Sequence, residues 1–307
     1  MQSHTASGLP KWSALVHTSR PVDIAGPRRD GSMVLAAAGR LALLRADGTV
    51  RSFAPAYRTS AGLEPYIAMP AIRHRGCSFG KGTVYALRLA PPGRGLVAIG
   101  AGRVRQFATI TARGLIDGIT FDETGHFGYR LLVTINHGQA ATVDAIGCHG
   151  TVHTLTRSAP RMEGGIAVAP PRFGRFAGDL IAPDEKSGQI FAITPGGSAR
   201  LVVRSRQPHG QDIGVESEGF IPGDRHAVAL LADRVSPGNP HPGDDVVLQL
   251  SVATLRAAGA RPGDLLVAGE GGARTEAVRC GRHGCRVLHV ADGPAIAHAE
   301  GHIAFMR

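Results

Sequence analysis

Acidic residues open one short pattern that recurs along the chain: a carboxylate, two variable residues and an isoleucine. Full copies of this Glu-x-x-Ile pattern begin at Glu64, Glu163, Glu218 and Glu300. Shortened forms of the pattern begin at Asp23 and Asp117. Carboxylates that are brought together repel one another, so a protein that gathers them needs protons or a cation. Oxygen ligands of this kind suit calcium or magnesium.

We therefore predict a divalent metal site where these carboxylates converge. The predicted ligands are Glu64, Asp117, Glu163, Glu218 and Glu300, with Asn136 as a neutral oxygen donor. The alternative interpretation is that each carboxylate only caps backbone amides where a loop enters a strand.

The C-terminal copy of the pattern adds two histidines. His298, Glu300 and His302 stand at alternate positions, so on a strand all three would project from one face. Two imidazoles and a carboxylate suit zinc, iron or manganese better than calcium. They could equally provide a general base beside a hard metal. His298 is therefore a candidate ligand and His302 a candidate catalytic residue.

A second set of polar residues stands at the ends of apolar runs. It comprises Asn136-His137, Asp184-Glu185, Asp233 and Glu270. Asp184 and Asp233 are candidates for proton transfer during catalysis. Turn residues that start the next hairpin are the alternative interpretation for each of them.

Many short strands must position these residues, because helical periodicity is nearly absent. Apolar runs at 131–135, 179–182, 227–231 and 264–268 are each followed by polar or glycine-rich turns, which predicts β-strands. Only 252–258 fits a helix, of about two turns. Up to Glu218 the acidic copies stand about 40 to 55 residues apart, the length of a four-stranded propeller blade.

We therefore predict an all-β fold, a β-propeller of about six blades with four antiparallel strands each. It would form a single domain over residues 1–307. The interval from Glu218 to Glu300 spans nearly two periods without a clear copy, which leaves the blade count open by one. The C-terminal strand around 300–306 is expected to fill an innermost position and close the ring, which removes exposed sheet edges.

One blade in particular resembles a known family. The segment Glu163-Gly-Gly-Ile-Ala-Val, with 178–184 and 188–193 after it, resembles a blade of NHL and gluconolactonase-type propellers. The senescence-marker and gluconolactonase group holds a divalent metal through a Glu of such a pair, an Asn and an Asp. The resemblance implies this role for Glu163, Asn136 and either Asp184 or Asp233. The His-x-Glu-x-His strand is also similar to streptogramin lyases, whose metal site uses histidine and glutamate.

Charge and composition argue against some functions. The net charge of +10 comes almost entirely from scattered arginine, and aromatic residues make up 5% of the chain. Nucleic-acid binding needs clustered basic residues or aromatic stacking platforms, so we do not expect it. No apolar run approaches the roughly 20 residues of a membrane helix, so we expect no membrane partner. We expect a monomer, and the arginine-rich composition is typical of a bacterial protein.

Four cysteines bear on the compartment. Cys280 and Cys285 flank a turn-forming segment and could form a hairpin disulfide, as in an oxidising compartment, with free thiols as the alternative. Cys77 and Cys148 are far from each other, and neither has another cysteine near it in the sequence. We expect a secreted or periplasmic protein if a signal has been removed, and a cytoplasmic one otherwise.

The leading functional hypothesis is a metal-dependent enzyme, lactonase-like or esterase-like, that acts on a small ester, lactone or secondary metabolite. The cation would polarise a carbonyl oxygen and position water. A non-catalytic propeller that binds a ligand or protein and carries structural calcium is the alternative. A third hypothesis is a lyase or cyclase of a biosynthetic pathway. A channel plugged at its centre would favour the binding propeller, and a deep open channel would favour an enzyme.

Overall fold

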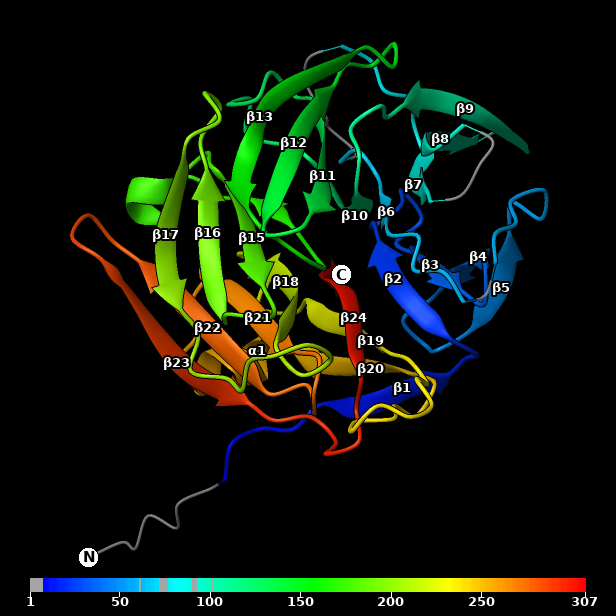
Figure 1. Ribbon diagram of the computed structural model, residues 1–307. Helices are drawn as coiled ribbons and strands as arrows, with labels where there is room; N and C mark the ends of the chain where they lie inside the picture. The colour runs from blue at the N-terminus through cyan, green and yellow to red at the C-terminus, as the bar shows by residue number, and fades with distance from the viewer. Residues whose placement is uncertain (1–7, 61, 72–76, 90–92, 101) are drawn as a thin grey trace, which may run out of the picture.

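Short β-strands make up nearly all of the regular structure in this computed structural model, which describes residues 8–60, 62–71, 77–89, 93–100 and 102–307. The strands form twisted sheets that stand around a central axis, with β24 (Ala299–Met306) and the C-terminus near the middle (Figure 1). The all-β propeller fold predicted from the sequence is confirmed.

Four of the sheets contain four antiparallel strands each, in the order of the sequence. The first contains β2 (Pro21–Ala25), β3 (Met33–Ala37), β4 (Arg40–Leu44) and β5 (Val50–Phe53). The second contains β6 (Ile67–Ala68), β7 (Val84–Arg88), β8 (Gly95–Gly100) and β9 (Arg103–Thr109). The third contains β10 (Leu115–Phe121), β11 (Leu131–His137), β12 (Ala140–Ile146) and β13 (Val152–Pro160). The fourth contains β14 (Ala167–Val168), β15 (Leu180–Asp184), β16 (Gln189–Ile193) and β17 (Ala199–Arg204), with the 3-10 helix η1 (Gly174–Phe176) between β14 and β15.

A fifth sheet has eight strands in the order β1-β20-β19-β24-β18-β21-β22-β23. The strands not yet given are β1 (Ser13–His17), β18 (Val215–Phe220), β19 (Val228–Asp233), β20 (Val246–Ser251), β21 (Leu265–Gly269), β22 (Thr275–Cys280) and β23 (Cys285–Ala291). Its two middle strands, β18 and β24, are parallel and meet at the pair Glu218 and His302. The other neighbouring strands are antiparallel, so the sheet consists of two four-stranded antiparallel runs side by side.

The chain passes between these two runs before it completes either of them. After β18 it forms β19 and β20 of the neighbouring run, and then the short helix α1 (Val252–Ala257), where a helix was predicted. It returns to form β21, β22 and β23, and finally crosses to β24. This exchange of strands accounts for the long interval between the acidic copies at Glu218 and Glu300.

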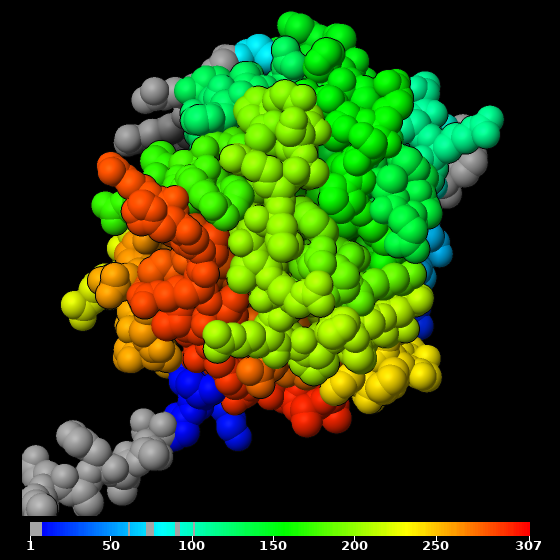
Figure 2. Space-filling view, turned by 60° about the vertical axis from the view of Figure 1, so that its left-hand side comes forward, coloured from blue at the N-terminus to red at the C-terminus, as the bar shows by residue number. Residues whose placement is uncertain are grey.

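The two ends of the chain meet in the eight-stranded sheet. β1 pairs with β20, and β24 pairs with β19 in the same run. The backbone N of Trp12 also donates to the backbone O of Asp292 at 2.9 Å. Figure 2 shows the N-terminal segment (blue) emerging beside the C-terminal segments (orange and red). Pairing both ends into one sheet leaves fewer unpaired edges.

The innermost strands touch one another in a closed ring. β2 contacts β6, and the contacts continue through β10, β14, β18 and β24 back to β2. Apolar and aromatic side chains fill the space between neighbouring sheets. The rings of Phe79 and Phe121, for example, meet edge to face with centroids 4.8 Å apart. Phe220 likewise packs on Phe173, with centroids 5.0 Å apart.

Two disulfides connect the cysteines. The predicted Cys280–Cys285 bridge closes the hairpin between β22 and β23. A second bridge joins Cys77 to Cys148, which are 71 residues apart in sequence and which the sequence analysis left unpaired. None of the helices among the described residues is long and apolar enough to span a membrane.

Candidate metal centre

Ionisable side chains gather where the innermost strands begin, at what we call the acidic end of the ring. This end consists of Glu64 before β6, Asp117 in β10, Glu163 before β14, Glu216 in β18, Glu300 in β24 and Glu270 directly after β21. The predicted convergence of Glu64, Asp117, Glu163 and Glu300 at one end is therefore seen in the structure. Glu216 and Glu270 join them from positions outside the Glu-x-x-Ile pattern.

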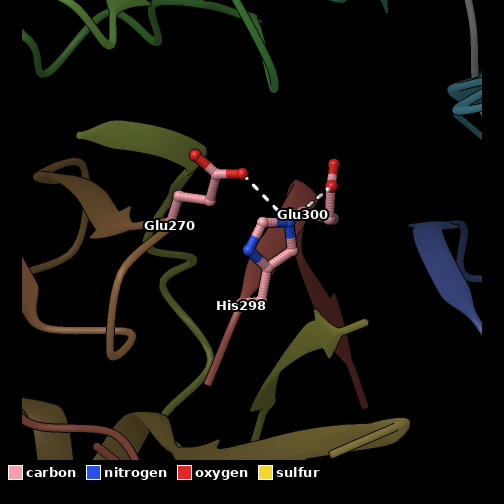
Figure 3. A group of neighbouring side chains, drawn as sticks. All are labelled: Glu270, His298 and Glu300. Carbon is pink, nitrogen blue, oxygen red and sulfur yellow. Dashed lines mark ion pairs between the residues drawn. The ribbon is translucent and has the colours of Figure 1, made fainter. Parts of the chain in front are cut away.

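His298 lies between two carboxylates of this end (Figure 3). Its Nε2 is 3.0 Å from Oε1 of Glu270 and 3.3 Å from Oε1 of Glu300. Each of the three residues is at most 7% exposed. One ligand atom from each lies within 4.8 Å of the other two, as a single metal ion requires. We call this set the His298 triad.

Protonation in the triad follows from burial and from the contacts. Burial disfavours the charged imidazole, but the hydrogen bonds to Glu270 and Glu300 outweigh it and raise the pKa of His298 to about 10. Burial raises the pKa of Glu270 to about 8, although His298 opposes the rise. Without a metal, a proton therefore stands where the cation would bind.

Tyr66 connects the triad to Glu216. Its Oη is 2.7 Å from Oε1 of Glu216 and 3.0 Å from Oε2 of Glu300. A hydroxyl group has one hydrogen to donate, so one of these carboxyls must be protonated to complete the second hydrogen bond. Burial, followed by the charges of nearby carboxylates, raises the pKa of Glu216 well above its usual range. The raised pKa favours the protonated form of Glu216.

Two arginines neutralise part of the acidic end. Arg234 pairs with Glu64, and its Nη1 is 3.3 Å from Oε1 of Glu300. Arg161 pairs with Glu163, and its Nη1 is 3.8 Å from Oδ1 of Asp184. Buried charges are normally paired in this way. Neither arginine was among the residues predicted from the sequence, although Arg161 stands two positions before Glu163 and Arg234 directly follows Asp233.

Asn136 and Asp117 form a second polar group near the triad. Asn136 Nδ2 donates to Oδ2 of Asp117 at 2.6 Å, and its Oδ1 accepts from the backbone N of Met162 at 3.1 Å. Burial raises the pKa of Asp117 to about 7. The amide oxygen of Asn136, which was predicted to bind a metal, is thus engaged with the backbone.

The two candidate catalytic aspartates, Asp233 and Asp184, make hydrogen bonds and contacts with neighbouring segments of the chain. Asp233 Oδ1 accepts from the backbone N of His298 at 2.9 Å and of Asp244 at 3.2 Å. It is fully buried, and burial raises its pKa to about 6. Asp184 accepts from the hydroxyl of Ser187 and faces Arg161. Asp233 therefore positions His298, and Asp184 lies by the Arg161–Glu163 pair.

Glu218 lies away from the acidic end, in contrast to its predicted place among the ligands. It sits further along β18, opposite His302, and is fully buried. Its carboxyl faces the backbone of Ala167 but makes no hydrogen bond of normal geometry with the described residues. Burial raises its pKa well above the usual range, so the group is a neutral acid.

His302 also differs from the expectation that it shares one face with His298 and Glu300. Its Nδ1 is 2.9 Å from Oδ1 and 3.1 Å from Oδ2 of Asp23. Gly301 has a φ of 65°, in the left-handed region, which interrupts the alternation of side chains along the strand. The structure therefore brings Glu300 together with His298 and directs His302 elsewhere.

A second set of ligand atoms lies next to the triad. Atoms of Glu185, Asp212 and Glu270 are within 4.8 Å of one another. Glu185 is buried, whereas Asp212 is exposed. Burial raises the pKa of Glu185.

Neither a protein-family model nor a curated protein matches the sequence. Solved structures do match. Regucalcin from Agrobacterium tumefaciens, described as a calcium-binding protein, aligns at 10% identity over 94% of this chain and 80% of its own, with a TM-score of 0.54. Virginiamycin B lyase from Staphylococcus aureus aligns at 13% identity over 88% and 84%, with a TM-score of 0.47. A gluconolactonase from Xanthomonas campestris aligns at 12% identity over 73% and 69%, with a TM-score of 0.44.

The resemblance holds at the level of fold. Both kinds of propeller that the sequence resembles, the gluconolactonase and regucalcin group and the streptogramin lyases, are among these solved structures.

Proposed function

We propose that the chain is a metal-dependent propeller enzyme that acts on a small ester, lactone or related secondary metabolite. The observation that supports this proposal is the His298 triad, two carboxylates and an imidazole whose ligand atoms lie within 4.8 Å of one another. Buried carboxylates and a histidine in one group form a donor set that divalent metals use in proteins. We take the metal ligands to be Glu270, His298 and Glu300.

The donor set bears on the kind of metal. Calcium and magnesium prefer oxygen ligands throughout, whereas an imidazole suits zinc, iron or manganese. We therefore place the transition metals first and keep calcium, which regucalcin is described as binding, as the alternative. When bound, such an ion supplies Lewis-acid chemistry, which polarises a carbonyl oxygen of the substrate.

The chain's own residues position this site and handle protons. Asp233 fixes the backbone of His298, and Arg234 holds Glu300 and Glu64 in place. Glu216 and Tyr66 keep a proton beside Glu300, where it can be donated to a leaving group. Asp184, beside the Arg161–Glu163 pair, is the proposed proton acceptor.

We further propose that the chain forms a single domain of six blades. The four separate sheets are four blades, and the two antiparallel runs of the eight-stranded sheet are two more, joined at Glu218 and His302. β24, at 299–306, would be the innermost strand of the last blade and β1 its outermost strand. Partners other than a small-molecule substrate are not proposed, and we expect a monomer.

A binding propeller without catalysis is the second candidate. The imidazole of His302 reaches across the middle of the ring, because it hydrogen-bonds to Asp23 on one side and faces the backbone of Ile119 and Ile166 on another. A ring that is closed in this way favours a binding scaffold over an enzyme with an open channel.

Metal analysis of matched variants tests the proposal. The protein is purified without chelators and analysed for metals, and is then titrated calorimetrically with manganese, zinc, magnesium and calcium. We expect one equivalent bound to the wild type and to Glu163→Gln, whose carboxylate is engaged by Arg161. We expect Glu270→Gln and His298→Ala to lose it. No binding of any of the four metals to the wild type would refute the metal centre.

Activity then separates the two candidate functions. The metal-loaded wild type is assayed against a panel of lactones and aryl esters, with Glu270→Gln as the inactive control. Turnover that disappears with the metal supports the enzyme. A protein that binds metal but turns over none of the panel favours the binding propeller.

A further inference from the structure

A pocket of about 450 Å³ lies at the end of the ring opposite the acidic end. Its walls are built from the C-terminal ends of innermost strands and the residues that follow them, among them Met69, Thr120 and Phe305. We propose that this pocket is a second ligand site, which binds a small and largely hydrophobic molecule independently of the metal centre. The proposal does not depend on the proposed function.

The side chain of His302 separates the pocket from the metal centre. It lines the pocket, and its Nδ1 is engaged by both carboxylate oxygens of Asp23. The imidazole also faces the backbone of Ile119 and Ile166. Because His302 belongs to β24 and pairs with Glu218 of β18, this one residue contacts strands on several sides of the ring. It therefore forms a floor between the two ends.

The carboxylate of Asp23 in this floor is already satisfied within the protein. Asp23 is fully buried and accepts from the backbone N of Ile24, Ile67 and His302 as well as from the imidazole. This carboxylate needs no hydrogen bond from a ligand. A ligand group that could pair only with this carboxylate would lose its water without finding a partner, which is unfavourable.

The walls are mostly apolar. Met69, Pro222, Ala304 and Phe305 line the pocket and are half-buried, so they present apolar surface to it. The isoleucines Ile24, Ile67, Ile119 and Ile303 lie behind this surface and are at most 2% exposed. The polar lining residues are few. Glu123 is one of them, and its Oε1 accepts from the backbone N of Ala71 at 2.8 Å. Small-molecule sites are typically concave, mainly apolar and of several hundred Å³, with a small number of polar groups.

This composition favours one chemical class of ligand. The body of the ligand would be hydrocarbon or aromatic and would contact Met69, Ala304 and Phe305. Any polar group would point outward, toward Thr120, Glu123 and Arg307.

Fluorescent hydrophobic probes test the site. The wild type is titrated with neutral N-phenyl-1-naphthylamine and with anionic anilinonaphthalene sulfonate, which distinguishes a purely hydrophobic ligand from one with a charged group. Met69→Asp places a charge on the pocket wall, and Thr120→Trp fills the pocket. Leu201→Asp is the matched control, because Leu201 is 48% exposed on β17 and does not line the pocket. Glu270→Gln removes a triad ligand at the acidic end.

We expect saturable binding of one equivalent of the neutral probe to the folded wild type. Met69→Asp and Thr120→Trp should weaken it by about tenfold or more, since a charge is costly in an apolar site. Leu201→Asp and Glu270→Gln should bind as the wild type does. If Met69→Asp does not fold, as judged by its thermal transition, Thr120→Trp gives the answer.

Three outcomes would overturn the proposal. They are the absence of saturable binding to the folded wild type, unchanged affinity in the folded pocket variants, and an equal loss in Leu201→Asp. Loss of probe binding in Glu270→Gln would show that the two ends are not independent. None of these results depends on whether the metal centre is catalytic.

Discussion

His302 Nδ1 lies 2.9 Å from Oδ1 of Asp23, and this buried pair joins residues that are 279 positions apart. Asp23 also accepts from the backbone N of Ile67 at 2.7 Å and of His302 at 2.8 Å. One carboxylate thus connects β2, β6 and β24 near the axis. It stabilises the closure of the ring at the point where the chain ends.

Removal of the Asp23 carboxylate should destabilise the folded protein. We expect Asp23→Ala to lower the free energy of unfolding by about 3 to 5 kcal/mol, because it leaves a buried imidazolium without a partner. It also leaves three buried backbone N–H groups without their acceptor. Urea denaturation measures the change. Asp47→Ala, at an exposed turn, is the control and should change stability much less. Equal effects of the two substitutions would contradict the role of Asp23.

The same pair makes stability depend on pH. Burial lowers the pKa of His302, but the Asp23 carboxylate outweighs it, so the pKa lies above the ordinary value of 6.5. A raised pKa in the folded state stabilises the protein below the unfolded pKa, and this contribution is lost as the pH rises through the folded pKa. The stability difference between wild type and His302→Gln should therefore be largest below about pH 6.5. Urea unfolding at intervals from pH 5 to 9 measures it, and a constant difference would show that His302 is neutral.

Local patterns were sufficient to predict the strands and the acidic end. Strand and turn signals are encoded by neighbouring residues, so the all-β fold, the helix at 252–258 and the Cys280–Cys285 hairpin were confirmed. The exchange of strands between the two runs of the eight-stranded sheet depends on contacts between distant segments, which no short pattern records. The Cys77–Cys148 bridge was missed for the same reason.

The composition of the site was only partly predictable. The spacing placed Glu300 and His298 together, whereas Glu270 comes from another strand end and was not among the predicted ligands. Arg161 and Arg234 are counterions because the fold brings them close to the carboxylates. No sequence motif marks them. Glu218 shares the pattern of Glu163, yet the bulge in β18 places Glu216 toward Tyr66 instead. Period-two reasoning fails wherever such an extra residue enters a strand.

Metal affinity should increase with pH. His298 must lose its proton before its Nε2 can bind a cation, and its pKa without metal is about 10. Metal and proton therefore compete, and at least one proton is released for each ion bound. We expect the affinity for manganese to rise by at least about tenfold per pH unit between pH 6 and 8. Calorimetry in buffers with different ionisation enthalpies counts the released protons. An affinity that does not change over this range would exclude His298 as a ligand.

The two disulfides should differ in their contribution to stability. Cys77–Cys148 closes a loop of 71 residues, and Cys280–Cys285 closes one of 5. Closing a longer loop removes more entropy from the unfolded chain, so the Cys77–Cys148 bridge should stabilise the protein more than the other bridge does. We expect its own contribution to be about 2 to 4 kcal/mol. We expect the double substitution of Cys77 and Cys148 by serine to lower the melting temperature more than that of Cys280 and Cys285. The reverse order would show that native-state packing dominates.

Gly301 separates His302 from Glu300, and its substitution tests that geometry. A Cβ added at Gly301, where φ is 65°, would lie 2.5 Å from the backbone O of Val22 and 2.6 Å from Oδ1 of Asp23. Gly31 is the matched control, since its φ is 79° and nothing lies within 4 Å of an added Cβ. Both substitutions place an alanine in the left-handed backbone region, which lowers stability by about 1 to 2 kcal/mol. Only Gly301→Ala also displaces Asp23, so we expect it to be the more destabilising in urea and to weaken metal binding through Glu300. Equal stabilities of the two variants would mean that the strands at the axis can move apart to accept the methyl group.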